Sequence, residues 1–162
     1  MTSTTGPRWT TLLEDAAAIA DEYRDSGWDV VVLEPEAVTP VEDEARTGFD
    51  VRVSTAEYDL VADLIDDGPV TVTAADVYYR PPDADDGRRV ALAVERDEET
   101  ETAVFVPLAY DLEESRSLFE TALLDEELLV HVLTDETDGW VSFSHDDPSL
   151  FLEESDIRRW DR

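Results

Sequence analysis

The sequence contains no cysteine and no lysine. Without cysteine the chain can form neither disulfides nor thiolate metal sites, and it has no thiol nucleophile. Without lysine it lacks the cation of a phosphate loop, the amine of a Schiff base and the base of a serine–lysine pair. These two absences exclude enzymes that depend on a thiol nucleophile, a phosphate-loop lysine, a lysine Schiff base or a serine–lysine pair.

Glycine is also scarce, and its spacing excludes further motifs. No two glycines are close enough for a G-x-G motif, so neither a dinucleotide-binding fingerprint nor a phosphate loop is present. No serine lies in a G-x-S-x-G sequence, which removes the nucleophile elbow of the α/β-hydrolases. The glycines are Gly6, Gly27, Gly48, Gly68, Gly87 and Gly139.

Positive charge is the third scarcity. All twelve cationic residues are arginines, against 42 Asp and Glu residues, which gives a formal net charge of −30. Such a charge repels itself in dilute solution, whereas in about 1 M salt the Debye length falls to about 3 Å and the repulsion is screened. We therefore expect a halophilic protein of a high-salt cytoplasm. A nucleic-acid mimic and a chain supercharged by design are the alternatives. Direct binding to DNA or RNA needs a basic face and is not expected.

The length and apolar content suit one globular domain. The 162 residues are 42% apolar, which predicts a single domain over residues 1–162, with residues 1–6 and 161–162 frayed. The N-terminal residues lack the basic region and continuous apolar core of a signal peptide, and no apolar run is long enough for a bilayer. We expect a cytoplasmic protein without membrane contact.

Apolar periodicity predicts three helices and seven strands. Trp9, Leu12 and Ala16 recur at helical spacing, and Gly27 is the expected left-handed end of that first helix. "STAE" from Ser54 and the pair Asp111–Glu114 are typical capping boxes of two further helices. Strands are predicted within residues 28–35, 49–54, 70–80, 88–96, 102–110, 128–134 and 139–145.

These elements predict an α+β fold in the order α-β-β-α-β-β-β-α-β-β. We expect one mostly antiparallel sheet, a meander plus a closing hairpin, with the helices on one face. Pro35 and Pro40 should bracket a loop, and Pro107 should place its strand at an edge or a bulge. The acids of "VERDEETETAVFV", residues 94–106, are expected in a turn and its flanks, facing water.

Two histidines suggest one candidate site. His131 and His145 lie on strands predicted to pair, and Asp146 follows the second, so the three could ligate a divalent metal through nitrogen and oxygen atoms. The simpler interpretation is that one histidine faces the helices or solvent, and that the acids of "HDDP" cap a turn.

Arginines and tryptophans suggest binding residues of another kind. Arg80, Arg88 and Arg89 flank "PPDADDG" and could bind a phosphate or carboxylate, or could pair with the aspartates of that turn. Trp140 and Trp160 could anchor a partner, because tryptophan is favoured at interaction hot spots, or could pack against the protein's own sheet.

The run "LLEDAAAIADEYRDSGWDVVVLEPEAVTPV" and the acid-rich, lysine-free style of the chain resemble a family of uncharacterised haloarchaeal proteins. The resemblance extends from about Trp9 to "GWVSFSH". It implies a halophilic archaeal cytoplasm and carries no functional residues.

Three functions are therefore open. The leading expectation is a non-catalytic binding or adaptor domain that acts through protein contacts, as a homodimer or with another protein, and needs no cofactor. The alternatives are a divalent-metal-dependent hydrolase using His131, His145 and Asp146, and an acidic mimic of nucleic acid.

The charge generates a first prediction. The fold should loosen in dilute buffer and recover in molar salt, because only then are the carboxylates screened from one another. Circular dichroism across a KCl titration checks this expectation. A melting temperature that does not change with salt would contradict the halophilic interpretation.

Overall fold

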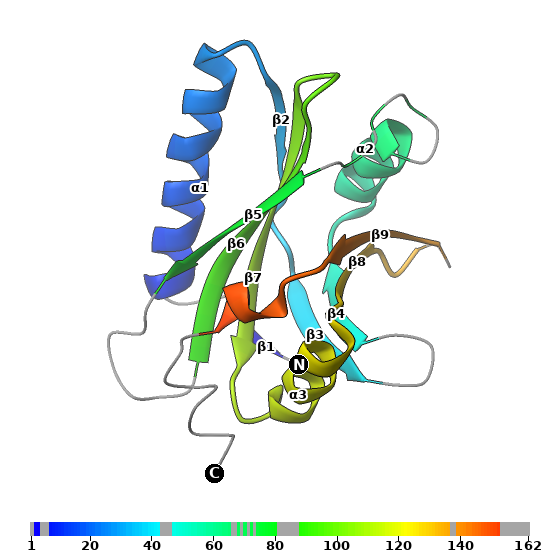
Figure 1. Cartoon of the computed structure of the whole chain (residues 1–162). Helices are drawn as coiled ribbons and strands as arrows, with labels where there is room; N and C mark the ends of the chain where they lie inside the picture. The colour runs from blue at the N-terminus through cyan, green and yellow to red at the C-terminus, as the bar shows by residue number, and fades with distance from the viewer. Residues whose placement is uncertain are drawn as a thin grey trace.

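Two β-sheets stack on each other across a shared apolar layer (Figure 1). The computed structural model describes residues 2–3, 7–42, 47–65, 68, 70, 72, 74–80, 88–136 and 139–152. Side chains are described for these residues except 2, 3, 7, 8, 79, 80 and 88.

Helices and strands alternate along the described residues. The helices are α1 (Pro7–Asp25), α2 (Thr55–Ile65), α3 (Arg116–Asp125) and the short 3-10 helix η1 (Pro148–Phe151). The strands are β1 (Thr2–Ser3), β2 (Asp29–Val32), β3 (Ala37–Glu42), β4 (Thr47–Arg52), β5 (Ala74–Arg80), β6 (Arg88–Asp97), β7 (Thr102–Asp111), β8 (Leu128–Leu133) and β9 (Trp140–His145). None of the helices among these residues has the length and apolar character that crossing a bilayer requires.

Both sheets mix parallel and antiparallel pairs. The five-stranded sheet has the order β1-β3-β4-β8-β9, and only β4 and β8 run parallel in it. The four-stranded sheet has the order β2-β7-β6-β5, and only β2 and β7 run parallel. The meander β5-β6-β7 and the closing hairpin β8-β9 are those predicted from the sequence.

Helix α1 covers the outer face of the four-stranded sheet. Its buried stripe of Trp9, Leu12, Ala16 and Ala20 packs on the side chains that β6 and β7 turn to that face. Gly27 follows the helix with φ +95°, so the predicted left-handed ending is confirmed. This packing secures one side of the sheet that carries the site described below.

The second core lies between the two sheets. Phe49 of β4, Tyr110 of β7 and Phe119 of α3 form its centre, with ring centroids 5.2, 5.8 and 5.6 Å apart. Helices α2 and α3 add Tyr58, Val61 and Leu118 to this layer, among other side chains. In Figure 1 α2 and α3 lie at opposite ends of the stack, which leaves α1 alone on the far side of β6.

The α+β class and the order of the predicted elements are confirmed. The number of sheets, the placement of the helices and one predicted loop differ from the prediction. The strands form two sheets rather than one, and the helices do not share a single face. The segment expected as a loop contains β3, whose Val38 is fully buried. Pro40 is tolerated there because β1 reaches only Ala37 and Val38, so β3 is an edge strand from Thr39 onward.

Pro107 also has a strand partner on one side only, although it lies in a central strand. β7 has neighbours on both sides, so the expectation of an edge strand is wrong for the strand as a whole. The pairing with β2 ends at Phe105, however, and Pro107 is paired only with Leu92 of β6. The proline therefore lies where one side of β7 is free of a ladder.

A polar contact fixes α3 to the end of β3. Ser117 and Thr121, one turn apart, donate to the two carboxylate oxygens of Glu42 at 2.7 and 2.5 Å. Hydrogen bonds from Thr121 and then Ser117 hold the pKa of Glu42 below its usual value. The contact helps to hold α3 over the open end of the inter-sheet core.

Candidate functional site

The two histidines lie on opposite faces of the five-stranded sheet. His131 on β8 is paired with Ser142, and β9 alternates exposed and buried residues so that Ser142 faces outward and His145 faces the core. Residues directly opposite in an antiparallel pair share a face. The structure therefore does not bring His131 and His145 together, so the two do not share the site that the metal alternative with Asp146 requires. Among the described residues no three His, Asp or Glu groups are placed to hold a metal ion.

His131 instead forms an aromatic stack on the outer face. Its ring lies parallel to that of Trp140, with centroids 5.7 Å apart and planes 6° apart. Trp140 remains 53% exposed while His131 is only 5% exposed. The tryptophan thus shields the histidine and presents its remaining surface to solvent.

Of the predicted arginine and C-terminal tryptophan site residues, only Arg89 has a described side chain. Arg89, the second residue of β6, is buried, so its guanidinium is not part of an exposed anion-binding surface. The side chains of Arg80 and Arg88, and the whole of Trp160, lie outside the described part of the chain. Their predicted roles as binding residues stay predictions.

His145 forms the most unusual contact of the inter-sheet layer. Its Nε2 lies 2.5 Å from Oε1 of Glu95, and the two side chains are 3% and 0% exposed. Glu95 lies on β6, with Ala75 of β5 on one side and Val104 of β7 on the other. A buried imidazole–carboxylate pair therefore joins the last residue of β9 to the centre of the facing sheet.

Aromatic and backbone contacts hold the imidazole in place. The ring of Phe151, in η1, meets the His145 ring edge-on at a centroid distance of 5.3 Å. Phe151 is itself held because Tyr110 donates its hydroxyl to the Phe151 carbonyl at 2.5 Å. Asp147 lies at the N-terminal end of η1 and accepts a hydrogen bond from the Ser149 hydroxyl, but its side chain does not cap the backbone of that helix as predicted for the acids of "HDDP". The chain after β9 therefore folds back over the pair.

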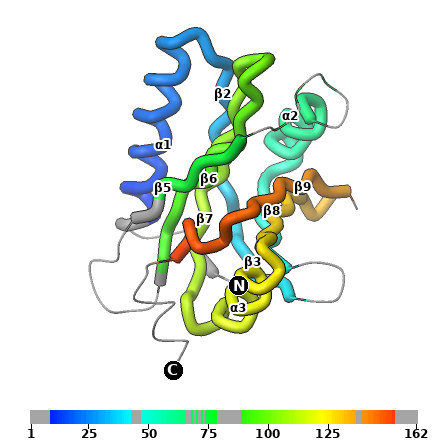
Figure 2. The backbone as a smooth tube through the Cα atoms, viewed as in Figure 1, coloured from blue at the N-terminus to red at the C-terminus, as the bar shows by residue number. Residues whose placement is uncertain are grey.

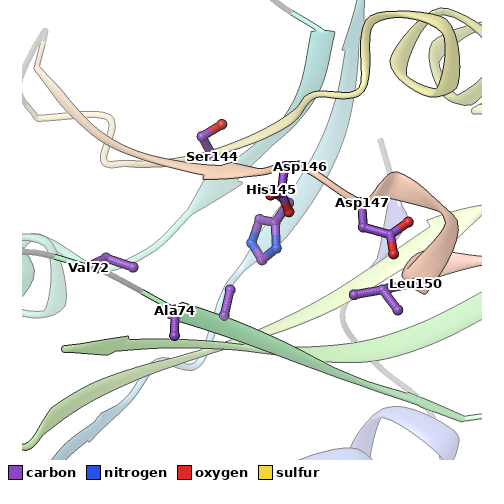
Figure 3. A pocket seen from close by; sticks show the side chains of 8 residues that line it. Val72, Ala74, Ser144, His145, Asp146, Asp147 and Leu150 are labelled. Atoms are coloured by element: carbon purple, nitrogen blue, oxygen red, sulfur yellow. The ribbon is translucent and has the colours of Figure 1, made fainter. Parts of the chain in front are cut away.

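A cavity of about 500 Å³ opens beside this pair. The start of β5 and the end of β9 run near each other there (Figure 2). From the β9 side it is lined by Ser144, His145, Asp146, Asp147 and Leu150, and from the β5 side by Val72, Ala74 and Ala75. We call this space the inter-sheet cavity. Figure 3 shows the His145 ring pointing into it from β9 towards β5.

The buried pair is not fully satisfied. Glu95 Oε2 is buried and has no hydrogen-bond partner, and His145 Nδ1 has none among the described residues. An unmade hydrogen bond of a buried carboxylate is costly, and more so than that of a neutral group. Of these two atoms, only the imidazole nitrogen belongs to a residue that lines the cavity, because Glu95 is not part of its wall.

The hydroxyl next to His145 does not supply a nucleophile. Ser144 points away from the cavity in Figure 3, and its Oγ donates to Glu127 at 3.2 Å. The polar groups that line the cavity are therefore the imidazole of His145 and the exposed carboxylates of Asp146 and Asp147.

A second hollow of about 470 Å³ lies between the end of α1, β2 and α2. Its wall is more apolar, with Trp28, Leu60 and Leu64, and its cation Arg24 already donates to the Val30 carbonyl at 3.1 Å. It offers no buried ionisable pair comparable to Glu95 and His145.

Sequence reasoning missed Glu95. The residue was placed with the acids that face water, yet it is 1% exposed, and Asp97 is 2% exposed. The alternation along β6 was the available signal, because Ala91, Ala93 and Glu95 share the inner face. A glutamate continuing a run of buried alanines differs from the acids Glu98 to Glu101 of the following turn.

The pair generates a double-mutant prediction. Glu95→Leu or His145→Leu alone should lower the free energy of unfolding by about 3–5 kcal/mol, because each leaves one buried polar partner alone. The double variant should recover much of that loss, since a well-packed apolar pair can replace a buried ionic one. Urea unfolding in molar KCl measures all three, with Ser144→Ala as the exposed neighbouring control. Strictly additive losses would contradict the pairing.

Comparison with known proteins adds a family and no function. No curated protein and no solved structure matches the chain significantly. A family model described as "Family of unknown function (DUF7529)" matches residues 2–153, nearly the whole length. The chain that places a buried Glu95–His145 pair beside the inter-sheet cavity therefore belongs to the DUF7529 family.

Proposed function

We propose that this protein is a non-catalytic binding domain that takes a small organic molecule in the inter-sheet cavity. The observation that carries the proposal is the buried imidazole of His145, which is held by Glu95 and lines a cavity of about 500 Å³. Small-molecule sites are usually concave, of about 300–1,000 Å³, with a few polar groups that fix the orientation of the ligand.

The cost of the pair supports a role beyond folding. Moving an imidazole and a carboxylate out of water is expensive, and an apolar pair of similar volume would often stabilise the fold as well or better. The pair adjoins the apolar inter-sheet core, which includes Ala91 and Ala93 of β6, although Arg89 and Asp97 of the same strand are buried as well. A polar pair in that layer, with its imidazole facing a cavity, is explained if a ligand bonds to the imidazole.

The position of the serine favours binding over covalent catalysis. Ser144 is the hydroxyl nearest in sequence to His145, and it is bonded to Glu127 on the other side of β9. A nucleophile must lie within hydrogen-bond reach of its base. His145 is instead oriented by Glu95 towards a space that a ligand can enter.

A ligand screen tests the proposal. Thermal-shift measurements with a library of small polar metabolites in about 2 M KCl should give at least one stabilising ligand, because binding to the folded state raises stability. Glu95→Leu/His145→Leu is the matched control, since it should remain folded and lose the response. Leu60→Ala, in the second hollow, should retain it. A response that survives in the double variant would place binding elsewhere.

A second candidate function rests on the outer face of the five-stranded sheet. Trp140 is 53% exposed at the start of the edge strand β9, beside the buried His131 ring. Rigid, half-exposed tryptophans are favoured anchors in protein interfaces. This observation supports the expectation of a domain that acts through protein contacts, with itself or with another protein.

Light scattering in molar KCl tests the self-association form of this candidate. If the outer face mediates a homodimer, the mass should be twice that of the chain, and Trp140→Ser should return it to the monomer. Leu124→Ser is the control, because Leu124 is also exposed but lies on α3. A monomer at high protein concentration would contradict a homodimer.

The environment is proposed on composition. A net charge of −30 without lysine supports a cytoplasm at molar salt. Ligand and partner binding should therefore be measured at high ionic strength, where the acidic surface is screened.

A further inference from the structure

We infer that the inter-sheet cavity takes a neutral polyhydroxylated molecule, a small polyol or sugar, through the free ring nitrogen of His145. The inference rests on the proposed function and names the chemical class of its ligand. It follows from the buried imidazole, from the carboxylates beside it and from the aliphatic part of the cavity wall.

The Nδ1 atom of His145 is the buried polar group that a ligand can reach. The side chain is 3% exposed and lines the cavity, and its ring points from β9 towards β5 in Figure 3. Glu95 occupies Nε2, whereas Nδ1 has no partner among the described residues. Unlike Oε2 of Glu95, Nδ1 is not closed off from solvent. A ligand in the cavity therefore meets one oriented nitrogen that has a hydrogen bond still to make.

The two protonation states of the ring favour a hydroxyl as the partner of that nitrogen. When a neutral imidazole donates its Nε2–H to Glu95, Nδ1 is an acceptor, and when the ring is protonated, Nδ1 is a donor. An ammonium group only donates and a carboxylate only accepts, so each fits one of the two states. A hydroxyl both donates and accepts, so it can bond to Nδ1 in either state.

The exposed carboxylates of Asp146 and Asp147 add acceptors around the imidazole. They repel an anionic ligand, and in molar salt their long-range attraction for a cation is screened. The short hydrogen bond from a hydroxyl to a carboxylate remains available there. The group that meets Nδ1 is therefore best carried on a molecule with further hydroxyls, which is a polyol rather than a simple alcohol.

The aliphatic part of the wall fits the carbon skeleton of such a molecule. Val72, Ala74 and Leu150 line the same cavity as the polar groups. A polyol carries C–H groups between its hydroxyls, and these gain by burial against aliphatic side chains. The volume of about 500 Å³ lies in the range usual for small-molecule sites.

Nitrogen NMR of histidine-labelled protein tests the inference. The chain has two histidines, and His131 lies on the other face of the five-stranded sheet, so it is an internal control. In about 2 M KCl, which screens the acidic surface, erythritol and myo-inositol should shift the Nδ1 resonance of His145 saturably and leave His131 unchanged. The four-carbon cation 1,4-diaminobutane and the four-carbon anion succinate should shift neither histidine.

Two variants separate the cavity from the acidic surface. Ala75→Leu narrows the cavity from the β5 side without a change of charge and should abolish the shift of His145. Glu99→Gln lies in the exposed turn after β6 and should leave the affinity for erythritol unchanged. The titration of the unaltered chain keeps the test decisive if Ala75→Leu does not fold.

The outcomes distinguish the two proposals. A shift of His145 that survives in Ala75→Leu, or an equal shift of His131, would place the polyol outside the cavity and overturn the inference. Binding of another molecule in the cavity while His145 does not respond to polyols would overturn the polyol class and leave the proposed function standing. Failure of every probe and of the metabolite screen would overturn both.

Discussion

The burial of β7 on both faces is the constraint on which the rest of the structure depends. All residues from Thr102 to Tyr110 are buried, and they alternate between two apolar layers. Val104, Val106 and Leu108 face the other sheet, while Ala103, Phe105 and Ala109 face α1. A strand of this kind requires cover on each side, so the fold needs both α1 and the five-stranded sheet.

The position of the Glu95–His145 pair follows from that constraint. β6 lies beside β7 and shares its two layers, so a buried polar residue at an inner position of β6 needs a hydrogen-bond partner, and for Glu95 that partner comes from the opposite sheet. The partner is the last residue of β9, where the five-stranded sheet ends and the chain turns back through η1. β9 ends at His145, and the inter-sheet cavity lies beside this end of the strand.

Local periodicity was enough to predict the helices and most strands. Helix α1 and the strands β6 and β7 have apolar spacing that depends only on neighbouring residues, and their observed bounds agree with the predicted ranges to within a few residues. β3 was missed because Pro40 resembles a loop signal, and its strand pairing depends on β1 and β4. The division into two sheets depends on the parallel pairs β2–β7 and β4–β8, which join segments far apart in sequence.

The candidate site was predictable only in part, for a physical reason. His145 and Asp146 were found because histidine is rare in this chain, whereas Glu95 was hidden among 42 acids. Acid density, which dominates the sequence, says little about where a carboxylate is desolvated. Only the face of the strand decides this, and the faces of β8 and β9 also separate His131 from His145.

The exclusion of water from a site also determines whether it can be selective for one ligand on such an acidic protein. The field of a chain with a net charge of −30 attracts every cation, so charge alone cannot distinguish one patch of this surface from another. In molar salt the exposed carboxylates are screened within about 3 Å, and their attraction falls for all ligands alike. A carboxylate that is shielded from water by two sheets is screened far less. Selective binding on this protein therefore depends on groups that are shielded from water, such as the imidazole of His145 in the inter-sheet cavity, and not on the acidic surface.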